Sequence, residues 1–212
     1  MRLWIKSACV AFVLTVLYSL IPFQAACTDI SGEVFRLHIL ANSDSEADQA
    51  LKLKVRDSVL ACSEALFAQA KSKEEAESLT ARHLQELAQV AAATVRENGY
   101  AYPVRAEIKK MFFTTRRYQA YTLPSGMYDA LRLTIGEGRG HNWWCVMFPS
   151  LCVNTNGEGD RKAKEALGEE EYRIVSEEKE YKFFIVELFD RFRGLVTGEN
   201  HAAFHTWQKR LG

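Results

Sequence analysis

The sequence has no excess of charge of either sign and very little proline. Its 212 residues carry 27 basic and 27 acidic side chains, with 4 prolines and 12 glycines. The balanced charge argues against a nucleic-acid partner and against a polybasic membrane-surface protein, because both rely on a strongly basic face. The scarcity of proline and glycine excludes collagen-like and low-complexity chains. Hydrophobic residues make up 48% of the chain, so we expect one folded domain with a full core.

The sequence also lacks the motifs of common catalytic and metal sites. The glycine-rich run at 136–140 has neither the spacing of a dinucleotide-binding loop nor the Gly-Lys-Ser/Thr ending of a phosphate loop. His201 and His205 are four residues apart, but Ala202 stands where a metalloprotease motif has glutamate. No second Cys/His pair lies at zinc-ligand spacing. We therefore expect no cofactor and no metal.

A long transmembrane run is missing as well, although the first 26 residues are largely apolar. Arg2 and Lys6 form a short positive segment, and residues 8–21 follow with few polar side chains. That run is shorter than the roughly 20 apolar residues of a spanning helix, and it suits a signal peptide. The end of the segment departs from both the common cleavage pattern and the lipoprotein pattern at Cys27. A cleaved signal peptide, a retained membrane anchor, lipidation and a cytosolic chain remain as alternatives.

The rest of the chain alternates between strand and helix patterns. A β-rich run at 33–40 precedes Ser43 and Glu46, whose spacing is that of a capping box at the start of a helix. Apolar residues at intervals of three and four then predict two successive helices, 46–70 and 72–98. Alternating apolar residues predict four further strands: 103–109, 117–123, 128–135 and 143–148. A strand, a two-helix hairpin and a mostly antiparallel β-meander make an α+β fold.

We expect these elements to form one domain over residues 30–153. Residues 154–180 are polar and acidic, which is typical of a solvated linker or a marginal helix. Within residues 181–212, apolar side chains recur at helical spacing from Ile185 to Val196. The chain is therefore predicted to end in an amphipathic helix and a short tail.

The stretch that follows the predicted strand 128–135 is the most unusual in the sequence. It consists of glycines alternating with polar residues, followed by two tryptophans: Gly136, Glu137, Gly138, Arg139, Gly140, His141, Asn142, Trp143 and Trp144. Glycine allows close backbone approach and positive φ, and tryptophan and arginine dominate binding hot spots. A glycine-rich hairpin with core tryptophans and a partner-recognition surface both remain open. Catalysis by Glu137 or His141 is a third alternative.

Two further groups of residues each have two interpretations. Cys145 and Cys152 are seven residues apart, and an exported protein can keep a disulfide, so a bridge and two free buried thiols both remain open. Basic residues also outnumber acidic ones around the predicted strand 103–109, with only Glu107 opposing Arg105, Lys109, Lys110, Arg116 and Arg117. That region either steers an acidic partner or is a solvated sheet face.

Three segments of the chain resemble the stage II sporulation protein R family. They are 36–45 (Arg-Leu-His-Ile-Leu-Ala-Asn-Ser-Asp-Ser), 48–57, and the block from 128 through Asn-Trp-Trp-Cys to the cysteine at 152. The resemblance covers roughly residues 30–153. It implies a signalling protein of endospore-forming bacteria, not an enzyme. Such a protein is exported from the forespore into the space facing the mother cell, where it activates a membrane-embedded aspartic protease that cleaves a sigma factor precursor.

With that function, we expect the partner-binding residues to lie in the unusual stretch and next to the first predicted helix. They are Arg132, Glu137, Arg139, His141, Asn142, Trp143 and Trp144, with Asn42 and Asp44 as a second patch. The last two have an alternative role as the cap of that helix. Replacing Trp144 by alanine is expected to abolish signalling in a protein that is still secreted and folded.

Two other functions compete with signalling. One is an exported cell-wall hydrolase, in which Glu137 is the acid and a tryptophan stacks on sugar. Glycoside hydrolysis needs a second carboxylate, and Asp129 is the near candidate in the sequence. The other is a wall-binding module without turnover.

Overall fold

The computed structural model describes residues 2–67, 70–118, 121–149, 158–176, 183–184 and 187–188. Its helices are α1 (Arg2–Glu33), α2 (Glu46–Phe67), α3 (Lys73–Arg82), α4 (Leu84–Glu97), α5 (Glu158–Leu167) and α6 (Glu169–Ser176). Its strands are β1 (Phe35–Leu40), β2 (Val104–Phe113), β3 (Arg116–Arg117), β4 (Thr122–Leu123), β5 (Gly126–Ile135) and β6 (Asn142–Phe148). The predicted α+β class is confirmed.

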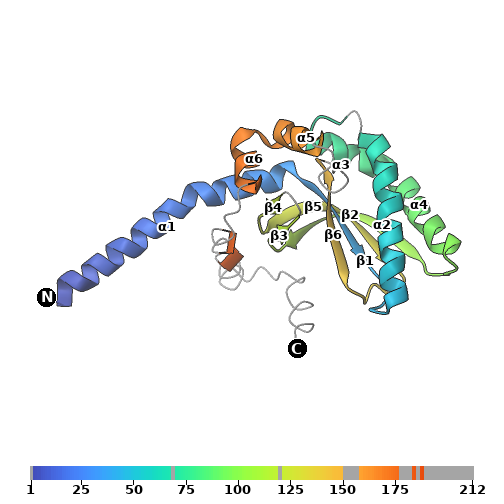
Figure 1. Ribbon diagram of the computed structural model, residues 1–212, viewed down its shortest axis with the longest axis horizontal. Helices are drawn as coiled ribbons and strands as arrows, with labels where there is room; N and C mark the ends of the chain where they lie inside the picture. The colour runs from blue at the N-terminus through green and yellow to red at the C-terminus, as the bar shows by residue number, and fades with distance from the viewer. Residues whose placement is uncertain are drawn as a thin grey trace.

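The main sheet has four strands in the order β2-β5-β1-β6 (Figure 1). β1 is parallel to β5, whereas the β1–β6 and β2–β5 pairs are antiparallel. The strands are therefore mostly antiparallel, but they do not form the simple meander expected, because β1 lies between β5 and β6. Burial explains that position, since every residue of β1 before Leu40 is buried and such a strand needs neighbours on both sides.

Helices α2 and α4 cover one face of this sheet, which is called the helix face below (Figure 1). The apolar stripes predicted from the sequence meet there: Leu51, Val55, Val59, Leu87, Ala91 and Val95 are all at most 2% exposed. Each fully buried Val or Leu side chain contributes about 1.5–3 kcal/mol. Every second residue of the strands points to the same face and completes this core, including Leu37, Leu131 and Leu133.

The predicted helix 72–98 is divided into α3 and α4 at His83, whose backbone is outside the helical region. Ser72 caps α3 as predicted, because its side chain accepts a hydrogen bond from the Glu75 amide. Gly99 ends α4 with a φ of 84°, the left-handed conformation that glycine adopts most easily. The predicted strand 117–123 is wrong, because the hairpin of β3 and β4 occupies that region.

The opposite face of the sheet is called the second face. The base of α1, the β3–β4 hairpin and α6 pack there on Phe113, Tyr128 and Val146. α5 and α6 fall within the segment predicted to be a linker or marginal helix, and their residues Leu167 and Val175 are buried in the same apolar cluster. Elsewhere the second face carries polar residues, including His38 and Arg132.

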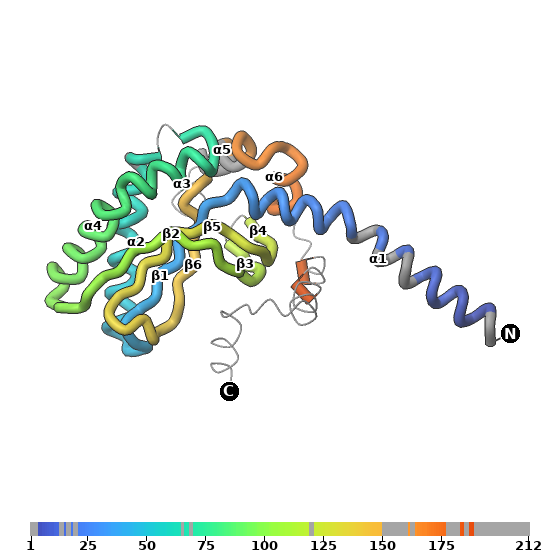
Figure 2. The backbone as a smooth tube through the Cα atoms, turned by 180° about the vertical axis from the view of Figure 1, so that it is seen from behind, coloured from blue at the N-terminus to red at the C-terminus, as the bar shows by residue number. Residues whose placement is uncertain are grey.

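Helix α1 extends away from the domain as one continuous helix (Figures 1 and 2). Its base belongs to the core, since Cys27 and Ile30 are buried and the Phe23 ring lies 5.4 Å from that of Phe183. Its outer part is exposed, with Trp4 at 83% and Tyr18 at 77%. Among the described residues, no helix has both the length and the apolar character that crossing a membrane requires.

Cys145 is disulfide-bonded, whereas Cys9, Cys27 and Cys62 are not in disulfides. Cys152, the partner considered from the sequence, lies outside the described residues. The same holds for most of the predicted C-terminal helix and tail at 181–212.

Candidate functional site

Two loops meet at one end of the main sheet, and together they are called the two-loop surface below. One is the β1–α2 loop at 41–45, and the other is the β5–β6 loop at 136–141. They are neighbours because β1 ends between the two strands that the second loop connects. The Gly140 amide donates to the Ala41 carbonyl at 2.9 Å, and the Arg139 amide donates to the Asn42 carbonyl at 3.2 Å.

The glycines of the β5–β6 loop are required by this contact. Gly136 and Gly138 have φ values of 58° and 63°, in the left-handed region that favours glycine. A Cβ atom on Gly140 would overlap the Ser43 carbonyl group, and one on Gly136 would overlap the Asn42 side chain. The close approach of the two loops therefore explains the glycines, but the predicted hairpin is wrong, because β1 lies between β5 and β6.

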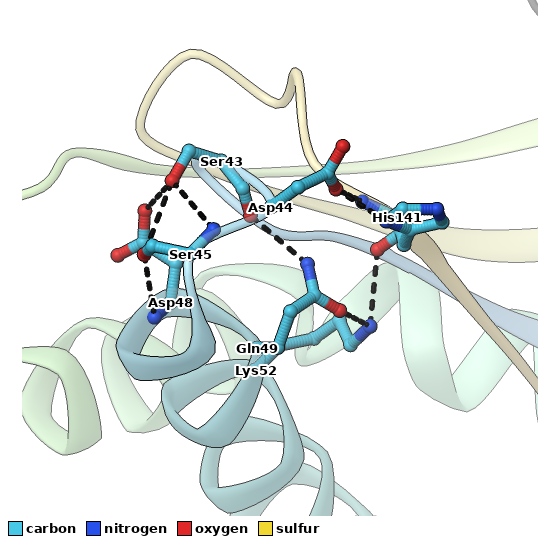
Figure 3. A network of polar contacts seen from close by, with 7 residues as sticks. All are labelled: Ser43, Asp44, Ser45, Asp48, Gln49, Lys52 and His141. Carbon is cyan, nitrogen blue, oxygen red and sulfur yellow. Dashed lines mark hydrogen bonds and ion pairs between the residues drawn. The ribbon is translucent and has the colours of Figure 1, made fainter. Parts of the chain in front are cut away.

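Asn42, Ser43 and Ser45 form a hydrogen-bond network around Asp48 at the start of α2. Figure 3 shows the two serines beside Asp48. The Asp48 carboxylate accepts from the Asn42 amide at 2.9 Å and from the Ser43 hydroxyl at 2.5 Å. Ser45 accepts from the Asp48 backbone amide, so Ser45 is the cap of α2 and the predicted Ser43–Glu46 capping box is wrong. Asn42 Oδ1 accepts from the Glu137 amide and thereby connects this network to the second loop.

Asp44 does not cap the helix but holds His141. Its carboxylate accepts from the His141 backbone amide and lies 2.5 Å from His141 Nδ1 (Figure 3). Lys52 of α2 donates to the His141 carbonyl at 3.0 Å and to Gln49, and Gln49 donates to the Ser43 carbonyl. These contacts hold both loops in one arrangement before any partner arrives.

A row of four side chains crosses the second face of the sheet beside the two-loop surface. Strand register places Glu107, Arg132, His38 and Trp144 side by side on β2, β5, β1 and β6. Arg132 lies 3.3 Å from Glu107, and the His38 ring is stacked on Trp144 with centroids 4.2 Å apart. Asn142 hydrogen-bonds His38 Nε2 at 3.0 Å. Arg132, Asn142 and Trp144 thus share one surface.

Burial dominates the electrostatics of this row. It lowers the pKa of His38 from 6.5 to about 4, although the Asn142 hydrogen bond opposes the shift; Arg132 and Arg36 lower it further. His38 is therefore neutral at pH 7. A ring with so low a pKa is a weak base, and His38 is buried against tryptophan at the middle of the sheet, so it is a structural element.

The two tryptophans point to opposite faces of the sheet, as alternation predicts. Trp143 is on the helix face, where the Arg56 guanidinium lies 4.6 Å from its ring centroid. Its buried Nε1 atom has no hydrogen-bond partner within the described part of the chain. Trp144 is on the second face and contacts Phe113 edge to face at 4.7 Å. Both are partly buried, so neither is a free surface side chain.

The structure thus brings eight of the nine predicted contact residues to one end of the molecule, and it separates Trp143 from them by the thickness of the sheet.

The predicted carboxylate pair for a hydrolase is not assembled. Asp129 is on the helix face, in an ion pair with Lys73 at 2.6 Å. Glu137 lies beyond the far end of β5, about 20 Å away at 3.3 Å per strand residue. Glycosidase carboxylates are about 5–9.5 Å apart.

Arg36 is a notable residue that the sequence interpretation missed. It is fully buried on the second face, with its guanidinium carbon 4.1 Å from the Phe113 centroid and 4.9 Å from that of Tyr128. It donates a hydrogen bond to the Tyr118 hydroxyl, and its Nε and Nη1 atoms have no hydrogen-bond partner among the described residues. An arginine alternating with apolar residues in a β-rich run was the available signal.

Comparison with known proteins identifies the family. A family model described as stage II sporulation protein R matches residues 31–158. A relative named stage II sporulation protein R, from Bacillus subtilis (strain 168), is 34% identical over 180 residues, covering 74% of this chain and 80% of the relative. The chain belongs to the stage II sporulation protein R family. No solved structure matches it.

Membership in this family gives the chain a role in sporulation. The matched residues 31–158 run from the end of α1 through all six strands, so they contain both loops and the cross-strand row. The resemblance stated from sequence segments is confirmed. The two-loop surface is built from the segments 36–45 and 128–152 that carried it, which lie about 90 residues apart in the chain and are neighbours in the fold.

Proposed function

We propose that this chain is an exported signalling ligand that activates a membrane-embedded aspartic protease of the mother cell. The activated protease then processes the mother-cell sigma factor precursor. The chain leaves the forespore through its apolar N-terminal segment and acts in the space between the two membranes. The sporulation role of the family supports this proposal, as does a surface suited to binding rather than to chemistry.

The observation that carries the proposal is a held yet exposed set of charged side chains. On the two-loop surface, the side chains of Arg139, His141 and Glu137 are 79%, 64% and 63% exposed. The backbone beneath them is fixed by hydrogen bonds to Ala41 and Asn42. A pre-ordered surface loses little conformational entropy on binding, so more of the contact energy remains available to a partner.

Activation requires that the ligand bind the active arrangement of the protease better than the inactive one. Stabilising a protease dimer would meet this condition, because an aspartic protease needs two carboxylates at one site. The two-loop surface would then contact protease residues that come together only in the dimer.

Reconstitution tests the proposal. The full chain, the membrane protease and the sigma factor precursor are co-produced in a non-sporulating host, and precursor cleavage is measured by immunoblot. We expect cleavage only when this chain is present and exported. The double variant Glu137→Ala/Arg139→Ala should reduce cleavage at least tenfold.

The matched control removes another exposed ion pair of similar geometry on α5, Arg161 and Glu165, whose side chains are 63% and 62% exposed. The variant Arg161→Ala/Glu165→Ala should cleave like the parent. Absence of cleavage with an exported, folded chain would refute direct activation, and turnover of purified peptidoglycan would favour a wall-acting enzyme instead.

A further inference from the structure

The outer edge of β2 is unpaired with any other strand in the part of the chain that the structure describes. β2 is ten residues long and runs along the border of the sheet from the end of α4 toward β3 (Figure 2). Its register with β5 is continuous from Val104 to Phe113, without a bulge. Natural edge strands are commonly short, bulged, interrupted by proline or lined with charged side chains, and of these β2 has only the charges.

The hydrogen-bonding direction of each β2 residue follows from one contact at its start. The Gly136 amide donates to the Pro103 carbonyl at 2.8 Å, which makes these two residues a hydrogen-bonded pair. In an antiparallel ladder such pairs recur at every second residue. Odd-numbered β2 residues therefore bond to β5, and the backbone groups of Ala106, Ile108 and Lys110 point away from the sheet.

The side chains along this edge are exposed and mostly basic. Arg105, Glu107 and Lys109 are on the second face, and Lys110 is on the other, so three basic residues against one acidic residue give a net charge of +2. Arg105 and Glu107 also line a hollow of about 580 Å³ with Arg132 and Glu137, next to the two-loop surface.

We propose that an extended acidic segment of the activated protease adds to β2 as a fifth strand. This inference rests on the proposed function and assigns the chemistry of the contact. Main-chain hydrogen bonds to Ala106, Ile108 and Lys110 supply affinity, and acidic side chains opposite Arg105 and Lys109 supply specificity. A second copy of this chain fits less well, because it would bring a second net charge of +2 to the same edge.

The position of β2 favours the same occupant. The strand follows directly on Pro103, whose carbonyl accepts a hydrogen bond from Gly136, the first residue of the β5–β6 loop. A segment lying along β2 would therefore continue directly from the two-loop surface. One partner could occupy both without a gap.

The test removes a single outward amide. Lys110→Pro deletes a backbone N–H that faces solvent and leaves the bonds between β2 and β5 intact, a position at which edge strands accept proline. In the reconstitution assay with the full chain, Lys110→Pro should reduce precursor cleavage at least tenfold. Lys110→Ala, which keeps the amide and removes one exposed charge, should reduce it less than about threefold. Circular dichroism and the melting temperature report folding.

Each outcome decides one question. No cleavage with the parent chain refutes the proposed function itself. Parent-like cleavage with a folded Lys110→Pro variant refutes strand addition, and so does an equal loss with Lys110→Ala, because charge alone would then explain the effect. A dimer in sedimentation that Lys110→Pro dissociates would assign the edge to a second copy. If Lys110→Pro does not fold, Ala106→Pro, compared with Ala106→Ser, repeats the test at another outward amide.

Discussion

His38 should make the stability of this protein fall on acidification. Its side chain is stacked on Trp144 and is 3% exposed. Burial lowers its pKa from 6.5 to about 4 in the folded state. Because the folded pKa is below the unfolded one, the unfolded chain binds the proton more readily. The contribution is fully present above pH 6.5 and is lost as the pH falls through 4.

The size of the effect follows from linkage. At pH 5 the unfolded histidine is almost fully protonated, whereas the folded one is about one tenth protonated. The free energy of unfolding should therefore be about 2 kcal/mol lower at pH 5 than at pH 7.5 through His38 alone, and about 3 kcal/mol lower once the pH is well below 4.

Urea unfolding of the purified protein at pH 7.5 and pH 5.0 measures this difference. The comparison variant is His38→Phe, which keeps an aromatic ring against Trp144 and cannot titrate. The parent should lose about 2 kcal/mol more than the variant between the two pH values, because titration of the carboxylates is common to both proteins. Equal losses would show that His38 titrates normally and that the burial argument is wrong.

Three other substitutions test contacts in the two-loop surface and on the two faces of the sheet, and denaturant unfolding measures their effect on stability. Gly140→Ala should lower stability by about 1–3 kcal/mol, because its Cβ overlaps the facing backbone, whereas Gly32→Ala, which meets nothing within 4 Å, should not. Asp129→Asn should cost about 2–4 kcal/mol, because the largely buried Lys73 ammonium loses its carboxylate. Trp144→Ala should cost about 2–4 kcal/mol and also lower precursor cleavage; a stable but inactive variant would place Trp144 in the contact alone.

The fold class and the helix face could be predicted from the sequence because periodicity reports burial on one side of an element. The stripe of Leu51, Val55 and Val59 was recognised in this way and is buried. The place of β1 could not be predicted, because no local pattern states which strands will flank it. The split at His83 was missed for a related reason: the helical pattern continues across the residue, and only its backbone conformation interrupts the helix.

In the site, too, some features could be predicted from the sequence and others could not. The glycine-rich stretch was recognised from composition, yet the reason for its glycines is a contact with Ser43 and Asn42, about 95 residues earlier in the chain. Ser43 was interpreted as a cap because the sequence cannot show that α2 begins directly after Ser45 and that the Ser45 hydroxyl accepts from the Asp48 amide. Arg36 was missed because charged residues inside strands are usually solvent-facing.

The position of β1 also explains how one surface can arise from two distant segments. A hairpin between β5 and β6 would have closed directly, without room for a third strand. With β1 between them, the connecting loop must cross the end of β1, and Gly140 then meets Ala41. Asp48 fixes the near side of that crossing and Asn42 joins it to the far side. A substitution at Asp48 should therefore disturb the exposed loop without touching it, which makes the start of α2 part of the two-loop surface in energetic terms.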